Sequence, residues 1–158
     1  MSHPNAETLD RFYRAFQAKD GDAMAAVYTE DATFSDPVFR GLKGHEVGGM
    51  WRMLCRRGKD LEVTYEVLSA GDVAGEARWE AHYTFGATGR KVHNRIRSSF
   101  TFRDGAVAAQ VDEFDLYAWT RMALGPMGLL LGWSPLVQNK VRRTARGGLD
   151  AFLSQSAP

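Results

Sequence analysis

The hydrophobic pattern of the chain changes period once, near Leu61, and no other feature constrains the fold as much. Before this point apolar residues recur at helical spacing, as at Leu9, Phe12, Tyr13 and Phe16. After it, apolar and polar residues alternate over long stretches, beginning with Leu61 to Val67. A chain that places its helices first and its long alternating strands afterwards is typical of an α+β fold, in which helices cover one face of an antiparallel sheet.

Three helical segments are expected before the change. The first begins at Asn5, which can act as its N-cap, and extends to Phe16. A second, short helix is capped by Asp20 or Asp22, and a third runs from near Gly44 to the cluster Arg56-Arg57-Gly58. Cations followed by glycine favour a helix C-terminus at that cluster.

Four strands are expected after the change, over residues 61–67, 77–85, 91–102 and 106–116, with glycine-containing turns between them. The alternation places Trp79 and Tyr83 on one face of the second strand. It places Asn94 and Ser98 on one face of the third. On the last strand Gln110, Asp112 and Phe114 share a side.

The C-terminal part has a different pattern. Residues 116–124 are expected to be helical, Gly125-Pro126 ends that helix, and Met127 to Trp133 is almost wholly apolar. Ser134-Pro135 then favours a new helix start. Its buried face is expected to carry Leu136, Val137, Val141, Ala145, Phe152 and Leu153. Its basic side carries Lys140, Arg142, Arg143 and Arg146, which we interpret as a solvated face, with anion or lipid head-group binding as the alternative.

Composition restricts the classes of partner. The chain has 158 residues, enough for one domain with its own core. Lys and Arg number 20 against 19 Asp and Glu, so we expect neither a nucleic acid nor a membrane as partner. The single cysteine, Cys55, and the polar N-terminus predict a soluble, cytoplasmic protein. The apolar run from Met127 to Trp133 is much shorter than the roughly 18 residues of a membrane span.

The motifs of metal, phosphate and nucleophile chemistry are not evident. The histidines, such as His82 and His93, do not have metal-ligand spacing, and no glycine-rich phosphate loop or nucleophile elbow follows a strand. We therefore expect no metal and no cofactor.

Asp36-Pro37 is a more specific feature. Proline keeps the preceding residue out of the helical region, so Asp36 is expected in extended geometry where the β-prone run Ala32 to Phe34 meets a turn. A carboxylate there is a candidate acid or base, and the alternative is an aspartate that serves only the turn.

The order of elements and three segments resemble the nuclear transport factor 2-like superfamily, in its SnoaL-like and ketosteroid-isomerase-like branch. The segments are Tyr28 to Val38, Gly41 to Gly44 and Val111 to Leu116. The resemblance implies a cone-shaped, cystatin-like α+β fold, with a curved antiparallel sheet covered by N-terminal helices. The resemblance covers roughly residues 5–117. It implies a domain over residues 1–117, and residues 118–158 are expected to be a helical extension packed on that domain.

The chain lacks residues that two known activities of this fold require. In its steroid isomerases an Asp before Pro-Val is the base, and Asp36 matches it. The tyrosine and acid that hold the oxyanion correspond to Phe12 and Ser98, so isomerisation is disfavoured. Epoxide hydrolases of the fold use an Arg-x-Asp that corresponds to Trp79 and Ala81, so their triad is broken as well.

SnoaL-type cyclases rely mainly on one aspartate of the last strand, and Asp112 resembles it. The resemblance predicts Asp112 as the catalytic base, with Asp36 as its companion. It predicts a ligand pocket lined by Phe12, Phe16, Tyr28, Trp51, Trp79, Tyr83, Asn94, Ser98, Gln110 and Phe114. The expected function is cofactor-free acid–base chemistry on a small hydrophobic substrate, of cyclase, isomerase or hydrolase type. The alternative is a non-catalytic module that binds a hydrophobic ligand or a protein partner.

Two expectations concern assembly. Sheets of this family pair back to back, so the outer face with His93, Arg95 and Arg97 is the expected surface of a homodimer. The run from Met127 to Trp133 is expected to close the cone, join the core or dock a partner.

Overall fold

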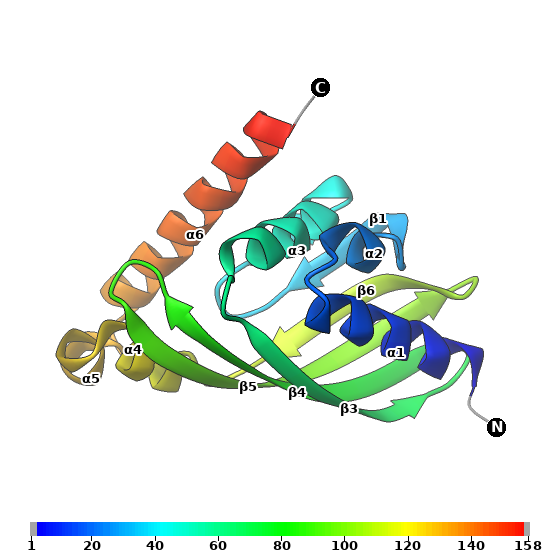
Figure 1. The fold of residues 1–158 in the computed structure, drawn as a ribbon, viewed down its shortest axis with the longest axis horizontal. Helices are drawn as coiled ribbons and strands as arrows, with labels where there is room; N and C mark the ends of the chain where they lie inside the picture. Colours follow the sequence, from blue (N-terminus) through cyan, green and yellow to red (C-terminus); the bar gives the residue numbers. More distant parts are fainter. Residues whose placement is uncertain (1–2, 157–158) are drawn as a thin grey trace.

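The computed structural model describes residues 3–156 and shows one curved sheet with helices against its inner face (Figure 1). The α+β class is confirmed. The helices are α1 (Pro4–Gln17), α2 (Gly21–Ala25), α3 (His45–Arg57), α4 (Leu116–Leu124), α5 (Pro126–Leu131) and α6 (Pro135–Ser156). The strands are β1 (Tyr28–Ser35), β2 (Leu42–Lys43), β3 (Glu62–Ala70), β4 (Ala74–Phe85), β5 (Arg90–Arg103) and β6 (Ala106–Glu113).

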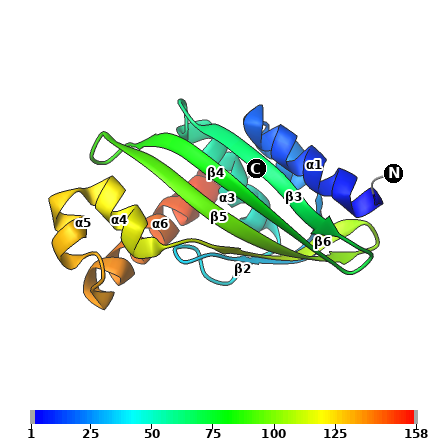
Figure 2. The same cartoon turned by 90° about the horizontal axis from the view of Figure 1, so that it is seen from below.

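The strand order is β2-β1-β6-β5-β4-β3. Strand β1 runs parallel to β6, and the other neighbours are antiparallel. Successive side chains alternate between a buried inner face and an exposed outer face, which is clearest along β5. Figure 2 shows that no helix covers the outer face of β3, β4 and β5.

Aromatic side chains fill the space between the inner face and the helices. Trp51 of α3 is central: it makes edge contacts with Phe12 and Phe16 of α1, with Phe34 of β1 and with Trp79 of β4, at centroid distances of 5.2 to 6.3 Å. Such pairs add to the free energy that area burial alone contributes. The cone is therefore closed by mutually packed rings.

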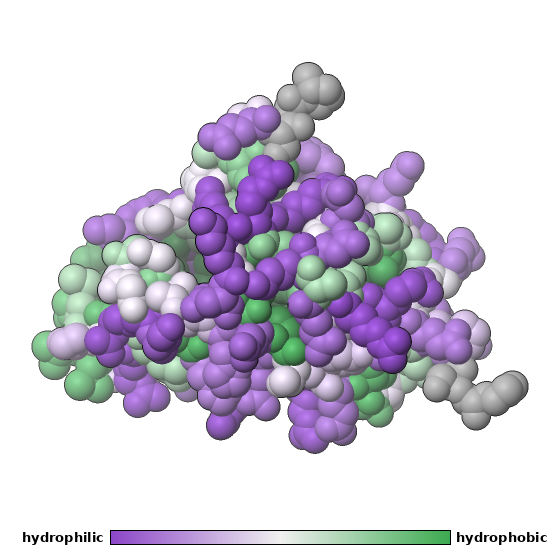
Figure 3. Space-filling view, in the orientation of Figure 1, coloured by the Kyte–Doolittle hydropathy of each residue, from purple (hydrophilic) through white to green (hydrophobic). Residues whose placement is uncertain are grey.

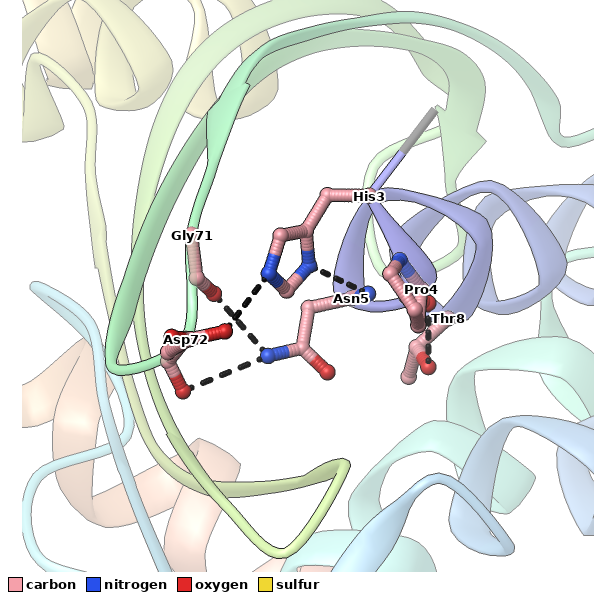
Figure 4. Close-up of polar contacts among 6 residues, drawn as sticks. All are labelled: His3, Pro4, Asn5, Thr8, Gly71 and Asp72. Carbon is pink, nitrogen blue, oxygen red and sulfur yellow. Dashed lines mark hydrogen bonds and ion pairs between the residues drawn. The ribbon is translucent and has the colours of Figure 1, made fainter. Parts of the chain in front are cut away.

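The first helix begins earlier than expected, because His3 and not Asn5 is its N-cap. The His3 ring accepts a hydrogen bond from the Asn5 amide at 3.0 Å (Figure 4). The Asn5 side chain instead donates to the carbonyls of Gly71 and Asp72, at 2.9 and 3.3 Å. It thus ties α1 to the β3–β4 turn. For the second helix, Asp20 is the cap, as one of the two alternatives predicted.

The last strand is shorter than expected. Strand β6 ends at Glu113 rather than near Leu116, because Asp115 accepts a hydrogen bond from the Ala118 amide and caps α4. The helix itself has the predicted bounds.

Two expectations about α6 are wrong in part. Leu136 is expected on the buried face but is 76% exposed, whereas Leu149 and Phe152 are buried. The basic side is not uniformly solvated: Arg142 donates to the Pro37 carbonyl at 2.8 Å, and Arg146 pairs with Glu46. These contacts fasten α6 to the β1–β2 turn and to α3.

Candidate functional site

Asp112 lies on the inner face of β6 and is 2% exposed. The sheet register sets Ser98 of β5 directly opposite it, and Gln110 lies two residues before it on the same face. The position follows from alternation along two long strands, so the fold itself brings these three side chains together.

Two donors hold the same oxygen of this carboxylate. Ser98 Oγ donates to Asp112 Oδ1 at 2.6 Å, and Gln110 Nε2 donates to it at 2.9 Å. The Ser98 hydroxyl in turn accepts from Tyr13 Oη at 3.1 Å and from Trp79 Nε1 at 2.9 Å. Neither bond to the carboxylate uses Oδ2, which is the oxygen available to exchange a proton.

A second branch leads to the same carboxylate through Gln110. Trp51 Nε1 donates to Tyr28 Oη at 2.8 Å, and the Tyr28 hydroxyl donates to Gln110 Oε1. Because the amide oxygen of Gln110 is engaged, its NH₂ is directed at Asp112. The two branches form one polar network across α1, α3, β1, β4, β5 and β6.

Burial dominates the acidity of Asp112. Desolvation raises its pKa from 3.8 to about 7, against the hydrogen bonds from Ser98 and Gln110, which lower the pKa. The charge of Asp36 raises the pKa further. The carboxyl therefore changes protonation state near neutral pH, which suits a group that both takes and returns a proton.

Asp36 lies where β1 ends, as predicted. Its Oδ1 accepts hydrogen bonds from the amides of Val38 and Phe39, at 2.7 and 2.6 Å, so it builds the turn around Pro37. Desolvation raises its pKa to about 6, opposed by these two amides. Asp36 is thus a turn residue that also titrates close to the pH range of Asp112.

The ten predicted pocket residues divide into three groups. Ser98, Gln110, Tyr28, Trp51 and Trp79 belong to the network around Asp112. Phe12 and Phe16 pack on Trp51, and Asn94 is buried farther along β5. Tyr83 and Phe114 lie toward the C-terminal helices, where Trp119 of α4 donates to the Tyr83 hydroxyl at 2.7 Å.

Tyr13 is the residue of this site that sequence reasoning missed. Alignment with the steroid isomerases points to Phe12, which has no hydroxyl, but the next residue is a buried tyrosine whose hydroxyl reaches Ser98. Its place in the apolar stripe of the first helix indicates burial. A buried tyrosine usually has a hydrogen-bond partner, so a tyrosine at this buried position indicates a polar contact inside the cone.

Two shallow hollows lie elsewhere on the surface. One, of about 410 Å³, includes Glu66, Arg78 and Arg95 of the outer sheet face. The other, of about 500 Å³, lies between His82, Lys91 and Met122. Within residues 3–156 no cluster of three metal-ligating side chains occurs.

Comparison with known proteins identifies the fold. A SnoaL-like domain matches residues 9–110. A nuclear transport factor 2-like protein of unknown function from Burkholderia pseudomallei is 18% identical, with a TM-score of 0.67 over 77% of this chain and 98% of its own. A putative polyketide cyclase from Silicibacter is 21% identical, with a TM-score of 0.67 over 75% of this chain and 94% of its own.

A third similar structure is that of an LEH-like epoxide hydrolase from Mycobacterium tuberculosis. It is 19% identical, with a TM-score of 0.61 over 84% of this chain and 96% of its own. A comparison with curated protein sequences found no match. The match begins within α1 and ends at Gln110 of β6, two residues before Asp112. It covers more than half of the chain, and the chain belongs to the SnoaL-like family.

Proposed function

We propose that this protein is an acid–base enzyme that acts on a small hydrophobic carbonyl compound, with Asp112 as the group that transfers the proton. The observation that carries the proposal is a buried carboxyl whose pKa is near 7 and whose Oδ1 is fixed by two donors. A base with a pKa near the working pH is the most effective for proton transfer.

The chemical step needs only the carboxyl and the substrate. Oδ2 takes a proton from the carbon next to the carbonyl, the C–H bond breaks, and its electron pair moves toward the carbonyl oxygen. The proton then returns from Oδ2 to another atom of the resulting enolate. Alternatively, the α-carbon of the enolate attacks a second carbonyl carbon of the same molecule and closes a ring, and the alkoxide formed at that carbonyl takes the proton from Oδ2. Ser98 and Gln110 are positioning residues in this account, because they fix the orientation of the carboxyl.

The substrate class follows from the surroundings. Aromatic rings around Trp51 favour a flat, apolar molecule, and Asn94 supplies an amide on the same inner face for a substrate oxygen. The similar structures described as a putative polyketide cyclase and as a protein co-crystallised with polyporic acid support an aromatic or polyketide-like compound. Entry requires the packed rings to move apart.

Deuterium exchange tests the proposal and does not require the product to be identified. The protein is incubated in D₂O with a panel of aromatic ketones and polyketone analogues, and mass spectrometry follows the incorporation of deuterium next to the carbonyl. We expect exchange with the wild type and a loss of about 10²–10⁴-fold in Asp112→Asn. The matched control is Glu113→Gln, the next residue, which is exposed on the outer face. Exchange at the wild-type rate in Asp112→Asn would overturn the assignment.

One observation favours the alternative, a non-catalytic binding module. The Ser98 hydroxyl uses its donor and both acceptor positions within the protein, so it has no donor left for a substrate oxygen. A computationally designed 17-OHP binder has a similar fold, with a TM-score of 0.61. Saturable quenching of tryptophan fluorescence by a panel compound, with no exchange in any compound, would select this function.

A further inference from the structure

The end of the molecule that carries α5 exposes a cluster of large apolar side chains. We call it the apolar tip; it consists of Met127, Leu129, Leu130, Leu131, Trp133 and Leu136. Leu130 is 69% exposed and Trp133 is 65% exposed. Figure 3 shows apolar surface at the left end, where Figure 1 places α5. This end is at the periphery of the molecule and away from the inner face of the sheet.

The apolar tip points outward because glycines occupy the inward side. A Cβ at Gly128 would lie 1.9 Å from the Thr120 carbonyl oxygen, and one at Gly132 would lie 2.0 Å from the Thr120 hydroxyl. Both glycines are therefore pressed against α4, and the large residues between them are turned away from the protein. A helix that packs for burial places its large apolar residues inward, so this segment has the reverse arrangement.

The backbone at the tip is supplied with internal partners. Tyr117 Oη donates to the Leu129 carbonyl at 2.8 Å, Trp133 Nε1 to the Leu130 carbonyl at 2.9 Å, and Gln138 Nε2 to the Gly132 carbonyl at 2.9 Å. Carbonyls at the end of a short helix otherwise need water. Because these three carbonyls are already hydrogen-bonded, moving them out of water into a medium of low dielectric constant costs less free energy.

Charge is distributed unevenly around the tip. Residues 116–149 contain five Lys and Arg and no Asp or Glu, although the net charge of the chain is +1. Lys140 and Arg143 are exposed and follow Leu136 at helical spacing, so they continue the same face of α6. The flanking acids are used elsewhere: Asp115 caps α4, and Asp150 pairs with Arg146 at 3.1 Å.

We infer that the apolar tip docks the protein on an anionic lipid surface, with α5 and the start of α6 in the interface and the cations against lipid head groups. Exposed Leu and Trp beside the exposed cations Lys140 and Arg143 form the chemistry of peripheral membrane attachment. In residues 3–156 no helix is long and apolar enough to cross a membrane. The expectation of no membrane partner rests on the net charge, which conceals this local excess.

A second copy of the chain is a less suitable occupant. A two-fold interface would set the tip against itself and bring the same cations together, which costs free energy. A lipid surface supplies the opposite charge. This inference goes beyond the proposed function and does not depend on it.

Vesicle co-sedimentation tests the inference. The full chain is mixed with vesicles of phosphatidylcholine alone or of an equal mixture with phosphatidylglycerol. We expect binding to the anionic vesicles, about tenfold weaker in Leu130→Ser and about fivefold weaker in Lys140→Gln or Arg143→Gln. The matched controls are Val73→Ser, 66% exposed at the β3–β4 turn, and Arg11→Gln, exposed on α1, which should bind as the wild type does.

The outcomes separate the occupants. All substituted side chains are exposed, so thermal unfolding should be unchanged and confirms that each variant folds. Absence of binding to anionic vesicles, or equal binding by Leu130→Ser, would overturn the inference. If the wild type instead sediments as an oligomer that Leu130→Ser dissociates, the tip is a contact between copies and the inference is wrong.

Discussion

Burial and hydrogen bonding act on the Asp112 carboxyl in opposite directions. Burial favours the neutral acid, while Ser98 and Gln110 favour the anion, and burial prevails. A carboxyl with a folded-state pKa above its unfolded value binds its proton more tightly in the folded protein. The contribution of this group to the free energy of unfolding is therefore highest below about pH 4 and falls as the pH rises toward 7.

The raised pKa of Asp112 makes the stability of the protein depend on pH. From this one group we expect the free energy of unfolding to fall by roughly 4 kcal/mol between about pH 4 and pH 7. Asp112→Asn removes this titrating group, so the variant should be more stable than the wild type at about pH 8. Its free energy of unfolding should also fall by less between about pH 5 and pH 8 than that of the wild type. Urea unfolding at several pH values measures both. In Glu113→Gln the free energy of unfolding should depend on pH as it does in the wild type. The same pH dependence in Asp112→Asn would contradict the raised pKa.

Among the elements, the outer face of β3 to β6 has no cover in residues 3–156. Its charges pair across strands: Arg78 with Glu66 at 2.9 Å, and Arg97 with Glu76 at 2.6 Å. These pairs leave the face nearly neutral, so a second copy can approach without strong repulsion. We propose that the chain forms a homodimer through this face, as the family resemblance implies.

A substitution on the sheet distinguishes this interface from others. Val111 of β6 lies on the outer face and is 46% exposed. We expect the wild type to sediment as a dimer at micromolar concentration and Val111→Arg to sediment as a monomer, because it buries a charge in the interface. Val73→Arg, at the β3–β4 turn, should remain dimeric. A monomeric wild type would be incompatible with the proposal.

Elements with a clear local pattern could be predicted from the sequence. The bounds of α4 follow from Gly125-Pro126, and the faces of β4 and β5 follow from their alternation. The cap of α1 could not be predicted, because the role of Asn5 depends on Gly71, which is 66 residues away. The exposure of Leu136 likewise depends on the path of α5, which periodicity does not describe.

The sequence predicts which side chains face the interior of the molecule, but it does not predict which hydrogen bonds they make with one another. Asp112, Ser98 and Gln110 are all expected inside the cone, and all three are buried there. Their hydrogen bonds, and the part played by Tyr13, depend on the packing of α1 against three strands. The ligand pocket stays a prediction; in the part of the cone where it is expected, the rings around Trp51 lie in edge contact with one another.

The whole molecule therefore has two features at different places: a buried carboxyl inside the cone and an apolar tip at its end. An NMR titration of the side-chain carboxyl of Asp112 tests the first of these features most directly. Carbon-13 labelled aspartate gives the resonances, and Asp112→Asn identifies the one that belongs to this residue. We predict a midpoint near pH 7. A midpoint near the ordinary value of 3.8 would contradict the account.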